Sequence, residues 1–333
     1  MNTAHLNRTM IIISGPTAAG KSDFALELAQ RIPSEIINMD MGQMYTPLSI
    51  GTAKPDWSSS PIVHHLFDTI DTPRNYTVVE YRKRVLELLE QLWANKKLPI
   101  VVGGSGFYLK SLFFPPDQHV AESEKYLLLQ QNLSVMATSA LWNELFAIDP
   151  VRAEKINKND RYRIERALLL WYAVGKKPSE CTLSYMPPAH YILLYVTRER
   201  QELYQRIDQR VVEMMRSGWI EEVRDLLDTD WSSFIQNKKI IGYNELIDFL
   251  TTSTQSLIEY EEMVAKIQQR SRHYAKRQDT FWRNLYKQLL LNISFHKDFK
   301  MPFIKEVCLS QGSQNKYIES IVSKIHKEEL GNE

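Results

Sequence analysis

The stretch that most constrains the fold lies near the start of the chain, where an apolar run meets a glycine-rich loop. Ile11-Ile12-Ile13 leads into Gly15-Pro16-Thr17-Ala18-Ala19-Gly20-Lys21-Ser22, which has the form G-x-x-x-x-G-K-S. An amphipathic run over 23–31 follows at once. Strand, loop and helix in this order are the context in which such a loop cradles phosphate groups. The segment therefore predicts an α/β fold with a P-loop NTPase-like parallel sheet flanked by helices.

The residue types in this loop indicate how a phosphate would be held. Glycines allow backbone conformations that a Cβ forbids. Loop N–H groups can then turn toward phosphate oxygens, assisted by the helix N-terminus. Lys21 would reach the outer phosphate, and the Ser22 hydroxyl would ligate Mg²⁺. The alternative is a glycine-rich turn that merely caps a helix. The loop does not say which phosphorylated molecule it holds, or whether a P–O or a C–O bond is broken.

Composition limits the class of protein. The chain has 333 residues, of which 44% are hydrophobic and 24% are charged, as in globular proteins with one large domain or two ordinary ones. No apolar run approaches the roughly 20 residues of a membrane span, and residues 1–9 are too short and polar for a targeting peptide. Cys181 and Cys308 indicate neither a disulfide framework nor a zinc site, so we expect a reducing cytoplasm. A net charge of +1 excludes a uniformly basic nucleic-acid binder but not a local basic face.

Two further predicted strands end in polar residues. Asp40 follows the apolar stretch 34–39, and Gly103-Gly104-Ser105-Gly106 follows the stretch 99–102. Because ligands of open α/β sheets lie outside the carboxyl ends of the strands, both segments should face the phosphate loop. From position alone, catalysis by Asp40 and a supporting role as helix cap or second-shell metal partner are equally good hypotheses. The adjacent His64 and His65 point in opposite directions, which favours packing or hydrogen bonding over a metal site.

The middle of the chain is predicted to be helical and separate from the sheet. A helix over 77–97 has a capping box, Thr77 to Glu80. After Pro115-Pro116 come the apparent helices 121–136, 139–148 and 161–174, with Asn159-Asp160 able to cap the last. We therefore expect a core of residues 1–116 plus 189–333, with C-terminal helices and a strand over 191–196, and an inserted helical subdomain over 117–188.

Three basic segments are candidates for RNA binding. Arg163 and Arg166 share one helix face. The segment 237–243 forms a basic loop, and the segment 266–287 mixes basic residues with aromatic ones, a combination that suits single-stranded RNA. Without other information, a solvated charged helix face is the better explanation for Arg163 and Arg166, and it explains the segment 266–287 at least as well as RNA binding does. Residues from about 292 to the end carry no motif that we can interpret.

Together these stretches resemble one family, the tRNA dimethylallyltransferases, also called tRNA isopentenyltransferases. The matching pieces occur in the family's order up to about residue 285, and as a set they are far more specific than the phosphate loop alone. They are G-P-T-A-A-G-K-S (15–22), I-I-N-M-D-M-G-Q-M-Y (36–45), I-G-T-A-K-P (50–55), V-V-G-G-S-G-F-Y-L (101–109), I-N-K-N-D-R-Y-R-I-E-R-A-L (156–168), R-I-D-Q-R-V (206–211), I-I-G-Y (240–243) and Y-A-K-R-Q (274–278).

The resemblance implies transfer of a dimethylallyl group from dimethylallyl diphosphate to N6 of adenosine 37 in the anticodon stem-loop of tRNA. The phosphate loop, residues 15–22, would hold the prenyl diphosphate with Mg²⁺, and Arg200 matches an arginine associated with the diphosphate. Asp40 matches the family's general base, and Ser105 stands where the family usually has threonine; both act with Lys21. The implied tRNA contacts are Asp40, Met41, Gly42, Gln43, Tyr162, Arg163, Ile164, Glu165, Arg166, Lys239, Ile240, Ile241, Gly242, Tyr243 and Asn244. We expect a monomer that does not associate with membranes.

Some positions depart from the family pattern. Met41 replaces a common serine, Lys158 and Arg161 replace prolines, and Asp279 replaces an apolar residue. These changes bear on RNA contact and not on the reaction. Two other functions compete with prenyl transfer. A P-loop kinase of small metabolites would leave the segments 239–243 and 274–278 unexplained. A non-catalytic RNA-binding switch would leave Asp40 and the 103–106 turn without a role.

Overall fold

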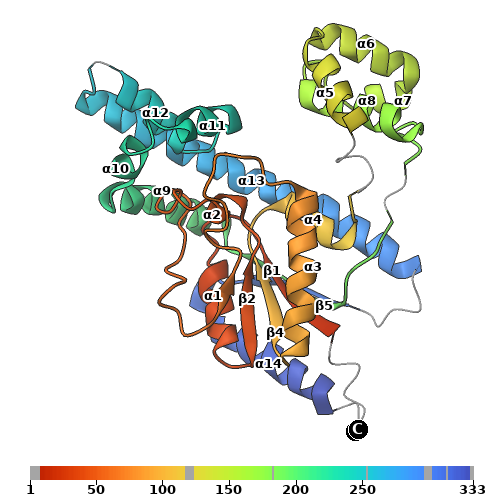
Figure 1. The fold of residues 1–333 in the computed structure, drawn as a ribbon. Coiled ribbons are helices and arrows are strands. Elements are labelled where there is room, and N and C mark those ends of the chain that lie inside the picture. The colour runs from red at the N-terminus through yellow and green to blue at the C-terminus, as the bar shows by residue number, and fades with distance from the viewer. Residues whose placement is uncertain are drawn as a thin grey trace. The chain divides into compact units, whose positions relative to one another are not determined.

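A parallel six-stranded sheet forms the centre of the fold (Figure 1). A computed structural model describes residues 8–116, 124–181, 184–252, 254–295, 302–312 and 314–330. The strand order is β3-β2-β4-β1-β5-β6, and every pairing is parallel. The bounds are β1 Thr9–Ser14, β2 Ser34–Asn38, β3 His64–His65, β4 Leu98–Val102, β5 His190–Thr197 and β6 Phe303–Cys308. The predicted P-loop-type α/β sheet is thus confirmed.

The strand register brings the polar strand ends to one edge. Ile13 of β1 lies beside Val102 of β4 and Leu194 of β5, and Asn38 of β2 also lies beside Val102. Because the strands are parallel, the loops that follow β1, β2 and β4 leave the sheet on the same side. The phosphate loop, Asp40 and the 103–106 turn therefore start from neighbouring points.

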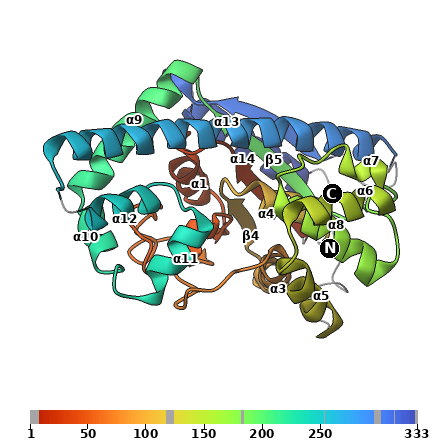
Figure 2. The same cartoon turned by 90° about the horizontal axis from the view of Figure 1, so that it is seen from above.

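Helices cover both faces of the sheet, as strand alternation dictates. Ile11 and Ile13 pack on the face covered by α1 (Lys21–Ala29), α9 (Arg200–Arg216) and α14 (Gln314–Leu330). On the opposite face, α3 (Val78–Ala94) contacts α4 (Gly106–Phe113), and the Phe113 ring lies 4.8 Å from that of Tyr191 on β5. The long helix α13 (Leu257–Phe295) crosses the carboxyl edge of the sheet (Figures 1 and 2).

Shorter helices stand near the same edge. Figure 2 shows α10, α11 and α12 gathered beside the loop that follows β2. Their apolar faces pack together, with Trp219, Trp231 and Tyr243 all buried. The bounds are α2 Met41–Met44, α10 Trp219–Arg224, α11 Asp230–Lys238 and α12 Tyr243–Thr251.

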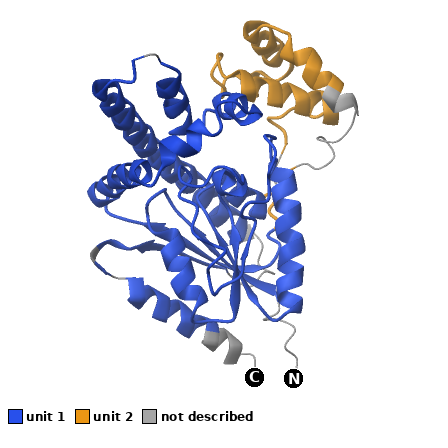
Figure 3. Ribbon diagram, turned by 60° about the vertical axis from the view of Figure 1, so that its left-hand side comes forward, with its two compact units in different colours: residues 1–113, 187–333 blue, residues 114–186 orange. Residues whose placement is uncertain are grey.

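The chain divides into two compact units (Figure 3). Unit 1 comprises residues 1–113 and 187–333, and unit 2 comprises residues 114–186. Unit 2 contains α5 (Glu124–Ser134), α6 (Thr138–Ile148), α7 (Pro150–Ala153) and α8 (Arg161–Val174), which bury a core of their own. The boundary expected from the sequence, residue 117, and the expected helix start at residue 121 lie outside the described residues.

Several local predictions can be checked directly. The Thr77–Glu80 capping box is present at the start of α3, and Asp160 caps α8 by accepting from the Arg163 N–H. His65 pairs with Glu35, which agrees with the hydrogen-bonding role. The strand β6 and helix α14, by contrast, lie in the segment whose pattern we could not interpret. Among the described residues, no helix is both long and apolar enough to span a membrane.

Candidate active site

The phosphate loop has a shape that only glycine permits at two positions. At Gly15 (φ 152°), a Cβ would stand 2.0 Å from the carbonyl oxygen of Val196. Gly20 caps α1 in the left-handed region at φ 95°. The first N–H groups of α1 have no acceptor within the helix. Together with the helix dipole they make the start of α1 a site for an anion.

Two arginines hold the outer side of this loop. Arg206 Nε donates to the carbonyl of Ala18 at 3.0 Å, and Arg198 Nε donates to that of Ala19 at 2.9 Å. With the carbonyls of Ala18 and Ala19 turned toward the arginines, the N–H groups at Gly20 and the start of α1 can face the opposite way, whereas the N–H groups of Thr17 and Ala19 already have partners within the fold. These contacts fix the loop in a shape ready for a phosphate group.

The charges beside the loop are one anion between two cations. Burial lowers the pKa of Lys21 to about 8, against the opposing effect of Asp40, and the Arg210 charge lowers it further. Burial also raises the pKa of Asp40, while the Lys21 and Arg210 charges lower it. The Lys21 and Asp40 side chains are half-buried, and the protein atoms around them exclude enough water for desolvation to be the largest influence on both pKa values. Lys21 Nζ donates to the carbonyl of Pro16 at 2.8 Å.

Asp40 has two structural partners besides its charge. It caps α2, since its Oδ1 accepts from the Gly42 N–H at 3.0 Å. Asn38 fixes the Asp40 backbone at both ends, because its amide accepts from the Asp40 N–H at 2.8 Å and donates to the Asp40 carbonyl at 2.9 Å. The cap role that sequence position allowed is therefore present, and the N–H groups of Gly42 and Gln43 at the start of α2 hold the carboxylate in place.

The glycine turn after β4 lies against the Asp40 segment. Ser105 accepts from the Met41 N–H through its hydroxyl at 3.2 Å, and its own N–H donates to the carbonyl of Met39 at 3.2 Å. A Cβ at Gly103 would stand 2.2 Å from Met39 O, so the close approach needs glycine. The structure thus brings together Lys21, Asp40 and Ser105, as predicted.

Gln278 on α13 connects the two glycine-rich loops, and sequence reasoning did not single it out. Its Oε1 accepts from the Thr17 N–H at 2.8 Å, and its Nε2 donates to the Gly104 carbonyl at 2.9 Å. Tyr274, one turn earlier, lies close enough for Asp40 to add to the rise in its pKa that burial causes. The Y-A-K-R-Q motif was the signal that could have indicated this role.

A metal ion would fit this site only if phosphate oxygens of the substrate supplied some of its ligands. Among the described residues, no group of three or more His, Cys, Asp or Glu side chains could hold a metal. Mg²⁺ usually keeps several waters and binds few protein ligands besides phosphate oxygens. The exposed Ser22 hydroxyl in the first turn of α1 satisfies that requirement.

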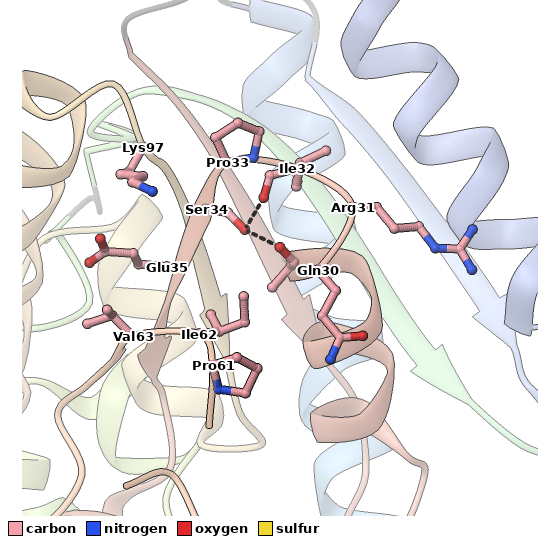
Figure 4. A pocket seen from close by; sticks show the side chains of 11 residues that line it. Gln30, Arg31, Ile32, Pro33, Ser34, Glu35, Pro61, Ile62, Val63 and Lys97 are labelled. Carbon is pink, nitrogen blue, oxygen red and sulfur yellow. Dashed lines mark hydrogen bonds between the residues drawn. The ribbon is translucent and has the colours of Figure 1, made fainter. Parts of the chain in front are cut away.

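The recess drawn in Figure 4 lies at the opposite end of β2. It has a volume of about 440 Å³ and is lined by residues 29–35, 61–63 and 97. Ser34 Oγ donates within it to the carbonyls of Ala29 and Ile32. Since the phosphate loop and Asp40 follow the other ends of their strands, we assign no part of the active site to this recess.

Comparison with known proteins identifies the family. A family profile described as IPP transferase matches residues 43–285, and one described as isopentenyl transferase matches residues 8–63. This chain belongs to the IPP transferase family. Among curated members, a tRNA dimethylallyltransferase from Pseudothermotoga lettingae is 33% identical over 86% of this chain and 90% of its own length. One from Thermotoga maritima is 34% identical over 85% and 92%.

Solved structures of IPP transferases agree with this assignment. A tRNA isopentenylpyrophosphate transferase from Bacillus halodurans is 27% identical, with a TM-score of 0.64 over 98% of this chain and 100% of its own. A eukaryotic dimethylallyltransferase described as acting on tRNA is also 27% identical, with a TM-score of 0.73 over 94% and 78%.

For Arg200, a predicted diphosphate residue of this IPP transferase, the described contact is not with the phosphate loop. Arg200 begins α9, is exposed, and lies over the Tyr204 ring at 5.3 Å. The arginines at the phosphate loop are Arg198 and Arg206, with Arg210 beside Lys21. The four-residue spacing of Arg206 and Arg210 puts both on one face of α9, which is the signal that sequence reasoning missed.

Predicted RNA contacts in unit 2 divide by burial. Tyr162, Arg163 and Arg166 are exposed on α8, with Tyr162 76% exposed. Ile164 is wholly buried in the core of unit 2, and Glu165 pairs with Arg161. The expectation that Ile164 touches RNA is therefore wrong for its side chain, because a helix that exposes 162, 163 and 166 turns 164 inward.

The segment 239–244 divides in the same way. Lys239 is exposed, whereas Gly242 and Tyr243 are buried. The Tyr243 hydroxyl donates to Glu222 at 2.6 Å. The buried Tyr243 side chain cannot contact RNA in this structure, and its predicted role is corrected to an internal one. Ile240, Ile241 and Asn244 are partly exposed, as are Met41, Gly42 and Gln43 around Asp40.

The departure at Asp279 has an internal explanation. Its Oδ1 accepts from the Tyr195 hydroxyl on β5 at 2.5 Å, and the Tyr195 ring stacks on Trp282 at 4.4 Å. The Tyr195 hydroxyl thus gives the Asp279 carboxylate a hydrogen-bond partner at a position where the family usually has an apolar residue.

Proposed function

We propose that this chain transfers a dimethylallyl group from dimethylallyl diphosphate to N6 of adenosine 37 in tRNA. The observation that carries the proposal is a carboxylate, Asp40, standing beside a phosphate loop in a member of this family. A kinase would share the loop, but the relatives from Pseudothermotoga lettingae and Thermotoga maritima are both named tRNA dimethylallyltransferase. We propose that a monomer is active, since Lys21, Asp40, Ser105 and Gln278 already lie together within one chain. We place the reaction in the cytoplasm, with its tRNA substrate.

The chemistry needs a base on one side and an anion cradle on the other. The exocyclic amine of adenine is a poor nucleophile because its lone pair is delocalised into the ring. As the C–N bond forms and the C–O bond breaks, Asp40 accepts a proton from N6, which typically contributes about 10²- to 10⁴-fold. The departing diphosphate gains charge on oxygens that face the α1 N-terminus, Lys21 and Arg210. Preorganised donors of this kind contribute about 3–4 kcal/mol each in other enzymes.

The residues present fit a magnesium ion that would bind together with the diphosphate, and we propose that the Ser22 hydroxyl would be its protein ligand. When bound, Mg²⁺ supplies charge neutralisation to the leaving group. Lys21 and the loop N–H groups orient the same oxygens from the protein side, and the half-buried setting of Lys21 and Asp40 keeps their interactions strong.

RNA binding is proposed for the exposed members of the predicted set. Arg163 and Arg166 in unit 2 suit phosphate contacts, and Tyr162 offers a ring for stacking. The target base must leave its stack to reach Asp40, which costs a few kcal/mol that these contacts must offset. Changing both arginines to glutamine should weaken tRNA binding and flatten its salt dependence by a slope of about 1 to 2. An unchanged slope would mean that Arg163 and Arg166 form a solvated helix face and do not contact RNA phosphates.

The test of the activity is one incubation. Protein, Mg²⁺, dimethylallyl diphosphate and an unmodified anticodon stem-loop are mixed, and the RNA is analysed by mass spectrometry. We expect one prenyl group on the adenosine beside the anticodon, and at most about a hundredth of that initial rate with Asp40→Asn. No gain in mass, together with phosphorylation of a metabolite in a parallel screen, would establish a kinase instead.

A further inference from the structure

A single carboxylate holds the loop that follows α2. Glu222 on α10 accepts hydrogen bonds from three consecutive backbone N–H groups, those of Ser49 at 3.0 Å, Ile50 at 2.7 Å and Gly51 at 3.3 Å. Successive N–H groups that converge on one anion form a nest, and charged acceptors make such bonds stronger than neutral ones. The turn over 49–51 is therefore fixed from α10.

Tyr243 completes this arrangement from α12. Its hydroxyl donates to Oε1 of Glu222 at 2.6 Å, and its side chain is fully buried. The Trp219 indole fills the space between two glycines, since a Cβ at Gly51 or Gly242 would stand about 2 Å from that ring. We call Glu222 and Tyr243, with this packing, the loop clamp.

The clamped loop in turn orients a side chain beside Asp40. Gln43 Nε2 donates to the carbonyls of Thr52 and Ala53, each at 3.2 Å. Both hydrogens of the Gln43 amide are used in these two bonds. This identifies which amide atom is the nitrogen and leaves Oε1 available as an acceptor. Within the described part of the chain, no group is seen to donate to that oxygen. The Gln43 backbone N–H also lies against the Asp40 carboxylate, because Gln43 stands in the first turn of the helix that Asp40 caps.

We propose that Gln43 reads the exocyclic amine of the target base, and that Glu222 and Tyr243 are positioning residues which keep its acceptor turned toward that base. This inference rests on the proposed prenyl transfer and specifies how its base is chosen.

The chemistry of adenine suits a site that offers only acceptors. The N6 amine has two hydrogens, and one is the proton that Asp40 accepts as the C–N bond forms. The other hydrogen stays on nitrogen throughout and needs an acceptor, which Gln43 Oε1 provides. Inosine and guanosine present a carbonyl oxygen at this position. That oxygen would face two acceptors, leaving buried polar groups unpaired, and such mismatches discriminate strongly between substrates.

The experiment compares stem-loops with adenosine or inosine at the target position, in three single variants and in the Gln43→Met/Tyr243→Phe double variant. Binding of each RNA is measured without prenyl diphosphate, and KM values for RNA and prenyl diphosphate are measured with the adenosine substrate. Gln43→Met keeps the side-chain length but removes the acceptor, and Tyr243→Phe removes only the clamp hydroxyl. The matched control, Tyr172→Phe, removes another tyrosine–carboxylate hydrogen bond, to Glu144 in unit 2.

We expect Gln43→Met to reduce the adenosine-to-inosine preference about tenfold and to raise the KM for RNA, with the KM for prenyl diphosphate unchanged. Tyr243→Phe should do the same to a smaller extent, about fivefold, whereas Tyr172→Phe should leave the preference unchanged. When Tyr243→Phe is added to Gln43→Met, the adenosine-to-inosine preference should not fall further, because the loop clamp acts on the base only through Gln43.

The alternatives give distinguishable results. Additive effects in the double variant, or an unchanged base preference in Tyr243→Phe, would overturn the positioning role. An unchanged preference in Gln43→Met would overturn base reading. If the unmodified protein transfers no prenyl group at all, the proposed function fails, independently of this inference.

Discussion

Replacing Asp40 by asparagine separates two roles that alanine would confound. Asp40 is both the proposed base and the N-cap of α2, where it accepts from the Gly42 N–H. Asparagine caps a helix about as well as aspartate, whereas alanine at an N-cap costs about 0.5–2 kcal/mol. Asparagine also matches aspartate in shape but cannot accept the proton from N6. The substitution therefore removes the chemistry and retains the local fold.

The expected size of the effect follows from these roles. Loss of a general base should reduce turnover about 10²- to 10⁴-fold, which corresponds to roughly 2.7–5.5 kcal/mol of transition-state stabilisation. The melting temperature should stay within a degree or two, because the cap survives. The KM for prenyl diphosphate should be unchanged or lower, since an anion between Lys21 and Arg210 has been removed.

Single-turnover transfer to an anticodon stem-loop measures the chemical step, and thermal denaturation measures the fold. Asp40→Ala serves as the comparison, with a similar loss of turnover and an additional loss of stability. If Asp40→Asn retains turnover within threefold of the unmodified enzyme, Asp40 is not the base, and its raised pKa has no catalytic meaning.

The other predictions concern the surroundings of this carboxylate. Because burial raises the pKa of Asp40 and the base must be ionised, kcat/KM should fall on acidification at a pH above the ordinary aspartate range. Lys21→Met should move that fall to still higher pH, and an identical profile in both proteins would contradict the coupling. Arg206→Met should raise the KM for prenyl diphosphate about tenfold by freeing the phosphate loop, while the exposed Arg200→Met should change it less than twofold; equal effects would refute the assignment. Gln278→Leu should lower kcat/KM for prenyl diphosphate about tenfold and should also lower the melting temperature, because the Thr17 N–H loses its acceptor. Wild-type values for both quantities would show that Gln278 does not hold the two glycine-rich loops together.

The strand-end rule explains why much of the site could be predicted. Parallel strands put Lys21, Asp40 and Ser105 at one edge however far apart they lie in sequence, and each follows an apolar run with a polar or glycine-rich end. Gln278 could not be found in this way. It reaches Thr17 across 261 residues from the middle of a long helix, and helical periodicity says nothing about which distant loop a helix crosses.

Motif matching has a different limit, seen at Ile164 and Tyr243. A motif marks a residue without saying whether it touches the substrate or holds something that does. Ile164 packs in the core of unit 2, and Tyr243 donates to an internal carboxylate. The strand β6 was missed for a third reason, since its sequence F-I-K-E-V-C at the sheet edge is largely half-buried and lacks the apolar run of a central strand.

The last helix that the structure describes packs against the first. α14 packs against α1, where Gln314 and Asn315 hydrogen-bond to Glu27 and Arg31 and where Ile318 and Ile321 join the core with Phe24. During synthesis, the apolar face of α1 that α14 covers therefore stays exposed until the ribosome has passed residues 314–330, about 300 residues after α1 itself. Contacts this distant in sequence slow folding and prolong exposure of apolar surface. A ribosome that stops before residue 314 would release a chain with its catalytic motifs present and the helix behind its phosphate loop uncovered.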